Sequence, residues 1–152
     1  MAVYFYEVEL AWKSNQEGVL TSHGLEGIDI ISPLEILGIK KSNWTPEHLL
    51  AGYISSCFMA TFLELAKDLK LDILTYQSQC FVKLEMVKGK FVTKEILLRP
   101  IITLLDDKLL LKAYKCIEDA EGACPAKSIL KIDIEVHPHF EYSKSETKAK
   151  AS

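Results

Sequence analysis

Hydrophobic and polar residues alternate in several short stretches of the chain, which is the pattern of half-buried β-strands. His23-Gly24 marks a turn between two of these stretches, and Lys88-Gly89-Lys90 marks the turn of a hairpin. Pro, Gly and Asn residues predict a loop over residues 32–45. Strands are predicted over residues 2–12, 17–22, 26–31, 72–87, 91–104 and 132–140.

The longest apolar stretch predicts the main helix. Thr45 suits the N-cap, Pro46 suits the first helical position, and Glu47 complements the positive end of the helix. We expect this helix to continue to about Leu69. Its middle is apolar nearly all round, so the pattern predicts burial on most of its sides.

Two further helices and the tail complete the predicted architecture. One helix is expected over residues 106–120 and closed by Gly122, and a short one opens at Pro125. Strands come in blocks joined by hairpins, with helices between the blocks, which predicts an α+β fold with antiparallel sheet. We expect one domain over residues 1–142 and a disordered tail over 143–152, which is rich in Lys, Ser, Thr and Ala.

Composition and charge narrow the classes of partner. The chain is 49% hydrophobic and 26% charged, which is typical of a soluble globular protein. Its net charge of -3 argues against nucleic acid, because phosphate binding needs a basic face. The start of the chain alternates like a strand and lacks a signal-peptide pattern, and the apolar run over residues 49–63 is shorter than a membrane span. We therefore expect a cytoplasmic protein with no membrane or nucleic-acid partner.

Cysteines supply the candidate chemistry. No two of them have the spacing of a zinc site, and His137-Pro138-His139 fits the edge of a strand better than a metal site, so we expect no metal and no cofactor. In the cytoplasm thiols stay reduced unless chemistry oxidises them. The four are Cys57, Cys80, Cys116 and Cys124.

Two of the cysteines allow either a structural or a chemical interpretation. Cys124 directly precedes a helix that begins with proline, where free N–H groups and the helix dipole favour a thiolate; it could equally be an unusual cap residue. Cys57 lies in the apolar run YISSCFMATF, where a mid-helix cysteine is usually packing but could be a nucleophile in a dry pocket. Cys80 and Cys116 are interpreted as core residues.

The segments WTPEHLLAGYISSCF (44–58) and CPAKSIL (124–130) resemble the osmotically inducible protein C and organic hydroperoxide resistance (OsmC/Ohr) family. That family has Pro-Glu at the start of its long helix, Cys-Phe ten residues after the glutamate, and a second cysteine in a Cys-Pro motif. Glu47, Cys57 and Cys124 match these positions, and the order of elements fits over residues 5–141. The resemblance implies an OsmC-like fold, with antiparallel sheets wrapped around two long central helices in an intertwined homodimer.

The resemblance also implies an activity. Cys57 matches the peroxidatic thiol, which attacks an organic hydroperoxide and becomes a sulfenic acid. Cys124 matches the resolving thiol, which condenses with the sulfenic acid to a disulfide that an external dithiol reduces. The apolar surroundings of Cys57 then form the wall of a pocket for an alkyl hydroperoxide. The substrate-binding candidates are Tyr53, Ile54, Phe58 and Lys40.

Glu47 and a missing arginine complicate this assignment. Ten helical residues span about 15 Å, so Glu47 cannot touch Cys57 of its own chain. In the family such an acid orients an active-site arginine at the dimer interface, which implies that Glu47 serves Cys57 of the other subunit; the alternative is a first-turn acid that complements the helix dipole. The one arginine of this chain, Arg99, lies in the later hairpin. Candidate substitutes for the missing arginine are Lys13, Lys40, Lys41 and His48.

Three functions therefore remain open. The first is a thiol peroxidase that reduces organic hydroperoxides as a homodimer. The second, favoured by the missing arginine, is a family member without peroxidase activity that binds a small apolar ligand or senses redox state. The third is a structural or interaction module whose cysteines are core residues.

Overall fold

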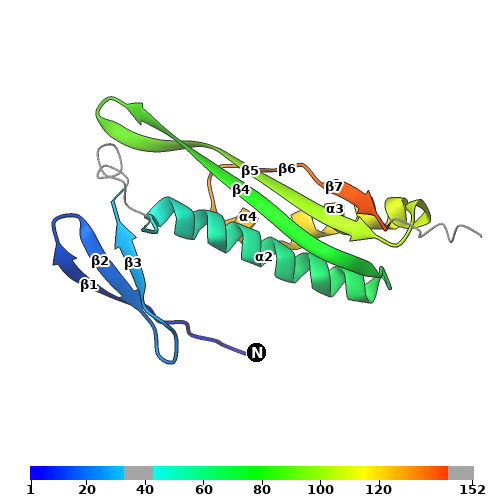
Figure 1. Cartoon of the computed structure of the whole chain (residues 1–152), viewed down its shortest axis with the longest axis horizontal. Helices are drawn as coiled ribbons and strands as arrows, with labels where there is room; N and C mark the ends of the chain where they lie inside the picture. Colours follow the sequence, from blue (N-terminus) through cyan, green and yellow to red (C-terminus); the bar gives the residue numbers. More distant parts are fainter. Residues whose placement is uncertain (33–42, 144–152) are drawn as a thin grey trace, which may run out of the picture. The chain divides into compact units, whose positions relative to one another are not determined.

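The computed structural model describes residues 1–32 and 43–143, which fall into two compact units, Met1–Leu50 and Ala51–Ser152. The first unit is built on a three-stranded antiparallel sheet in the order β1-β2-β3 (Figure 1). Gly24 adopts a φ of 75° in the expected turn between β2 and β3. The strands are β1 (Glu9–Ser14), β2 (Glu17–Thr21) and β3 (Ile28–Ile31).

The first strand is shorter than the sequence predicts. Its pairing begins at Glu9, which lies opposite Thr21, the last residue of β2. Residues 2–8 therefore have no strand partner within the described chain, although they are rich in Val, Tyr and Phe. Most of the predicted loop over residues 32–45 lies outside the described residues, but Trp44 forms a bridge with Ile30.

The main helix, α2, spans Pro46–Asp68 and begins as the sequence predicts. The Thr45 hydroxyl accepts a hydrogen bond from the His48 backbone N–H at 3.2 Å, and the Thr45 N–H donates to His48 Nδ1 at 3.1 Å. This reciprocal pair satisfies two backbone donors at the helix start, as a capping box does. The helix gives way to a residue with positive φ, Lys70, and the next N–H, of Leu71, bonds back to the carbonyl of Ala66.

Only one stripe of α2 is buried, so the predicted burial on most sides is wrong for the described chain. The buried residues recur every fourth position, which is one face of a helix. By length and composition alone α2 would also qualify as a membrane span, but core helices of soluble proteins share that property. The buried stripe consists of Ile54, Phe58, Phe62 and Ala66.

The hairpin of the second unit follows the prediction closely. β4 (Ile73–Val87) pairs antiparallel with β5 (Lys90–Leu104) along its whole length. Lys88 and Gly89 both have positive φ, which is the geometry of a type I′ turn. Lys88 thus adopts a left-handed backbone conformation that is usually occupied by glycine or asparagine.

The last predicted strand is split in two. β6 (Ile134–Val136) and β7 (His139–Tyr142) both pair parallel with β5, so this sheet is mixed rather than purely antiparallel. Pro138 lies between them and has no N–H to donate to the ladder, which explains the interruption. The chain reaches this edge through helices, not through a hairpin, and this connection permits parallel pairing.

The connecting helices are η1 (Asp107–Leu109), α3 (Leu110–Ala123) and α4 (Pro125–Ile129). Gly122 lies inside α3 and does not close it, contrary to the prediction. The helix ends at Cys124, whose backbone is extended (φ -65°, ψ 119°) because the following Pro125 disfavours the helical region. The α+β class predicted from the sequence is confirmed, with a mixed second sheet.

The core of the second unit forms where α2, the hairpin and α3 meet (Figure 1). The Phe62 ring on α2 lies 5.6 Å from the Tyr76 ring on β4. On α3 the Cys116 thiol donates to the Phe62 carbonyl at 3.6 Å. The predicted single domain over residues 1–142 stays a prediction, and residues 144–152 of the predicted tail lie outside the described residues.

Replacing Phe62 by alanine tests this core. Phe62 is fully buried, so we expect Phe62→Ala to lower the free energy of unfolding by about 3–5 kcal/mol through lost burial and a residual cavity. The matched control is Leu111→Ala on α3, where the side chain is 84% exposed and the change should stay within about 0.5 kcal/mol. Urea titrations of both variants measure the difference, and equal destabilisation would contradict the assigned core.

Candidate active site

Two thiols that are far apart in the sequence meet in the second unit. Cys57 lies in the middle of α2 and Cys124 lies immediately before α4. Their Sγ atoms are 3.7 Å apart, with the Cys124 thiol donating to the Cys57 sulfur, and neither cysteine is in a disulfide. Cys124 is 5% exposed and Cys57 is half-buried. Because an S–S bond is about 2.05 Å long, a small movement would be enough to join them.

Local structure places Cys124 at this point. Pro125 fixes the first position of α4, and Ala126, the next residue, is fully buried. Burial raises the pKa of the Cys124 thiol, the neighbouring Cys57 raises it further, and the backbone N–H groups of Ala126 and Lys127 act in the opposite direction. The net rise keeps Cys124 protonated near neutral pH, so it acts as the donor of the pair.

A small apolar hollow adjoins Cys124 but is not lined by Cys57, and its volume of about 10 Å³ is close to what one water molecule needs. Ile54 and Phe58, both predicted from sequence as substrate-binding residues, lie in its wall and belong to the buried stripe of α2. Lys127 and Glu121 bring opposite charges to the same hollow, with their nearest N and O atoms 3.9 Å apart. The remaining lining residues are Leu98, Cys124, Ile134 and Val136.

Tyr53, the third of the predicted substrate-binding residues, lies beside the thiols instead of in this hollow. It precedes Cys57 by four residues, so the two side chains are neighbours on one face of α2. Its pKa is raised by partial burial first, and then by the charge of Cys57 and a hydrogen bond with it. The Tyr53 hydroxyl is therefore within electrostatic range of the two thiols.

The residues predicted to replace the missing arginine all belong to the first unit. Lys40 and Lys41 lie outside the described residues. Lys13 forms an ion pair with Asp29 at 2.7 Å, and both side chains are more than half exposed. His48 is occupied by the Thr45 cap.

Glu47 and Arg99 also have defined surroundings. The Glu47 Oε2 atom is buried and has no hydrogen-bond partner among the described residues. Arg99, in β5, lies with its guanidinium carbon 5.3 Å from the centre of the Phe81 ring. That cation–π contact occupies the one arginine of the chain.

The remaining cysteines differ from the pair. Cys116 is fully buried and burial raises its pKa to about 11, which agrees with the core role predicted for it. Cys80, in β4, is only half-buried, and burial also raises its pKa. Within the described residues no group of three His, Cys, Asp or Glu side chains could hold a metal ion.

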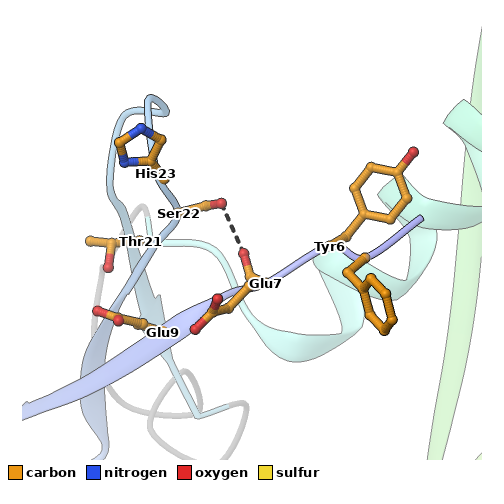
Figure 2. Close-up of a pocket in the computed structure, with 7 residues that line it drawn as sticks. Tyr6, Glu7, Glu9, Thr21, Ser22 and His23 are labelled. Atoms are coloured by element: carbon orange, nitrogen blue, oxygen red, sulfur yellow. Dashed lines mark hydrogen bonds between the residues drawn. The ribbon is translucent and has the colours of Figure 1, made fainter. Parts of the chain in front are cut away.

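The first unit has an open hollow of its own, lined by residues around β1 and β2. Figure 2 shows the Glu7 and Glu9 carboxylates and the His23 ring there, with the Ser22 hydroxyl donating to the Glu7 carbonyl at 2.8 Å. Tyr6, at its edge, is 93% exposed. These side chains are solvated and do not converge on a common point, so the hollow does not compete with the thiol pair as a reactive site.

Lys127 and Glu121 were not singled out from the sequence. The signal was present, because each stands three residues from Cys124 on a helix that ends or begins there. In the sequence Lys127 and Glu121 look like ordinary surface charges. Only their place in the wall of the hollow beside Cys124 sets them apart.

Known proteins resemble this chain in sequence family and in fold. A family model for OsmC-like protein matches residues 39–138. No curated protein sequence matches the chain. An OsmC-like protein of unknown function from Vibrio cholerae has a similar structure, with a TM-score of 0.76, 17% identity, and 90% of this chain and 99% of that chain covered.

Organic hydroperoxide resistance proteins are also among the similar structures. OhrB of Bacillus subtilis gives a TM-score of 0.68 at 22% identity, covering 92% of this chain and all of that chain (100%). A protein of the same description from Elizabethkingia anophelis gives 0.70 at 21% identity, with 91% and 98% covered. At these identities the likeness concerns the fold.

The thiols should differ in their rates of alkylation. Near pH 7.5 we expect Cys116 to react slowest with iodoacetamide, because its pKa near 11 leaves almost no thiolate and its sulfur is shielded from reagent. Peptide mass spectrometry over a time course gives the rate at each cysteine. In denaturant all four rates should converge, and a Cys116 that reacts as fast as Cys57 in the native protein would contradict the structure.

Proposed function

The chain belongs to the OsmC-like protein family, and on that premise we propose that it is a thiol-dependent peroxidase that reduces organic hydroperoxides. The observation that carries this proposal is the 3.7 Å separation of the Cys57 and Cys124 sulfurs. In this assignment Cys57 is the peroxidatic cysteine and Cys124 is the resolving cysteine. A cytoplasmic location, where thiols are kept reduced, suits this chemistry.

The reaction proceeds in three balanced steps. The Cys57 thiolate attacks the outer oxygen of the hydroperoxide; an S–O bond forms, the O–O bond breaks, and the leaving alkoxide takes a proton to become an alcohol. The Cys124 thiol then displaces hydroxide from the Cys57 sulfenic acid, giving a disulfide and water. An external dithiol reduces the disulfide, is oxidised to its own disulfide, and restores both thiols.

The apolar surroundings of Cys124 support an organic substrate. Ile54, Phe58 and the neighbouring β-strand residues are apolar, and such surroundings favour an alkyl group over a small polar peroxide. The hollow that they line, about 10 Å³ in volume, would have to open to admit one. Lys127 places a cation near Cys124, and its ammonium group lies 3.9 Å from the Glu121 carboxylate. Organic hydroperoxide resistance is named for the proteins from Bacillus subtilis and Elizabethkingia anophelis, and this agreement supports the substrate class.

A homodimer forms part of the proposal. The side of α2 away from its buried stripe carries exposed apolar side chains, including Tyr53, Met59 and Leu63, each 38–39% exposed. Its charged residues, Glu64, Lys67 and Asp68, are confined to the last turns of the helix. The first unit adds exposed Phe5 and Trp12. A second copy of the chain, burying such surfaces, would remove the free-energy cost of leaving them in water.

Glu47 supports the same arrangement. Its buried Oε2 lacks a hydrogen-bond donor among the described residues, and a buried carboxylate oxygen needs one. Helix rise places it about 15 Å along α2 from Cys57 of its own chain. We therefore assign Glu47 to the site of the second subunit, where a cation of that subunit would complete it.

The runner-up is a family member without peroxidase activity that binds a small apolar ligand or senses redox state. It is favoured by one observation: the arginine of this chain lies against Phe81 instead of at the thiols. A sensor would still form the disulfide but would not turn over. The two functions therefore differ in their steady-state rate with excess dithiol.

Substitution of the thiols tests the proposal. We expect Cys57→Ser to lower the consumption of cumene hydroperoxide, in the presence of a dithiol, to the uncatalysed rate, because serine is not a nucleophile of comparable strength. Cys124→Ser should retain the first step and accumulate a sulfenic acid on Cys57, detected by dimedone labelling and mass spectrometry. Cys80→Ser is the matched control and should turn over normally. Wild-type protein that shows no turnover would favour the runner-up.

The dimer has a separate test. Leu63→Lys places a charge on the exposed half of α2, so we expect it to shift the protein from dimer to monomer in analytical ultracentrifugation. Leu111→Lys, on an exposed position of α3, is the control and should leave the dimer intact. Wild-type protein that sediments as a monomer at micromolar concentration would contradict the homodimer.

A further inference from the structure

The outer end of the β4–β5 hairpin extends beyond the rest of its sheet. β6 and β7 pair only with residues 96–98 and 101–104 of β5, so residues 81–95 form a two-stranded ribbon around the Lys88-Gly89 turn (Figure 1). The buried residues of β5 begin at Ile96, and none of residues 81–95 is buried. Both faces of this ribbon are therefore accessible to water in the single chain.

Apolar side chains occupy both faces of the ribbon next to the turn. Met86 and Phe91 lie directly opposite each other, so they share one face. Val87 and Val92 belong to the other face, because successive residues of a strand alternate between faces. These four side chains are 36–53% exposed. A partner that covers one face of the ribbon would leave apolar surface on the other face in water, which costs free energy.

The same end of the hairpin is positively charged. Residues 83–95 contain four lysines and two glutamates, which leaves a net charge of +2 in a chain whose total is -3. Lys83 forms an ion pair with Glu85 at 2.9 Å. Lys88 and Lys90, at the turn, are exposed and form no ion pair with a residue in the described ranges 1–32 and 43–143. Two unpaired cations beside apolar side chains fit a surface that is anionic and has an apolar layer beneath.

We propose that the hairpin tip, residues 86–92, docks the protein on the anionic surface of a membrane. Lys88 and Lys90 contact the lipid headgroups, and the four apolar side chains enter the boundary between headgroups and acyl chains. The cytoplasmic leaflet of a membrane carries such anionic lipids. A bilayer surface surrounds a protruding tip on all sides, so it covers both apolar faces at once. This inference goes beyond the proposed function and does not depend on the thiols.

Docking of this kind differs from spanning the bilayer. The expectation of no membrane partner was drawn from the apolar run over residues 49–63, which is shorter than a membrane span. A peripheral contact needs no such run, because a few apolar side chains and lysines bind reversibly at the interface. Nucleic acid would attract the same lysines but offers no apolar layer for Met86 and Phe91.

Co-sedimentation of the full chain with phosphatidylcholine vesicles, with and without about 30 mol% phosphatidylglycerol, tests the inference. We expect the wild-type chain to bind the anionic vesicles far more tightly than the neutral ones. The double variant Lys88→Gln with Lys90→Gln should weaken the partition coefficient about 30-fold, because each lysine near the surface contributes about fivefold. High salt should weaken wild-type binding as well, because it screens the attraction.

Two further double variants separate charge from apolar contact. Lys108→Gln with Lys112→Gln makes the same change of charge at exposed positions of η1 and α3, and it should leave the partition coefficient nearly unchanged. Met86→Ser with Phe91→Ser keeps the tip lysines and should weaken binding about tenfold through lost apolar contact. Far-UV circular dichroism checks that each variant is folded.

Several outcomes would overturn the inference. They are wild-type binding that is absent or equal on the two kinds of vesicle, and an equal loss in the two pairs of lysine variants. Binding of a duplex DNA fragment in place of the anionic vesicles would assign the tip to nucleic acid. Dissociation of the dimer by Met86→Ser with Phe91→Ser, in analytical ultracentrifugation without vesicles, would assign it to a second copy. No hydroperoxide is present in these assays, so their result is independent of the proposed peroxidase.

Discussion

The approach of Cys124, at the start of α4, to Cys57 on α2 is the contact on which the candidate site depends. It brings two sulfurs, 67 residues apart in the chain, to within 3.7 Å. Ile54 and Phe58 on α2 and Ala126 on α4 are all buried close to these thiols in the chain. Because these residues lie in the core, the same burial that stabilises the second unit also fixes the geometry of its thiols.

That burial also has an electrostatic cost. Removing a thiol from water favours its neutral form, and the raised pKa of Cys80, Cys116 and Cys124 follows from this rule. In the proposed reaction both thiols attack as thiolates, so burial slows each of them unless the surroundings supply hydrogen-bond donors or a cation. The one arginine of the chain lies against Phe81 and does not supply that charge.

The sequence predicted much of this arrangement, and its failures have physical causes. The cap at Thr45, the hairpin turn at Lys88-Gly89 and the Cys-Pro helix were predictable because each depends on a few neighbouring residues. The parallel pairing of β6 and β7 was not, because it depends on where two helices return the chain to the sheet. The approach of Cys57 and Cys124 followed only from the family resemblance, since no local rule relates residues so far apart.

The prediction that α2 is buried on most sides also failed, for a different reason. An apolar pattern shows that a helix face avoids water but does not show what covers it. The apolar residues Tyr53, Met59 and Leu63 on the other side of α2 remain exposed in the single chain. Covering it by a second copy is a bimolecular event, so the stability of the fold would rise with protein concentration. At high dilution the dimer would dissociate and the helix that carries Cys57 would be exposed to water. The reactivity of the Cys57 thiol would then depend on protein concentration.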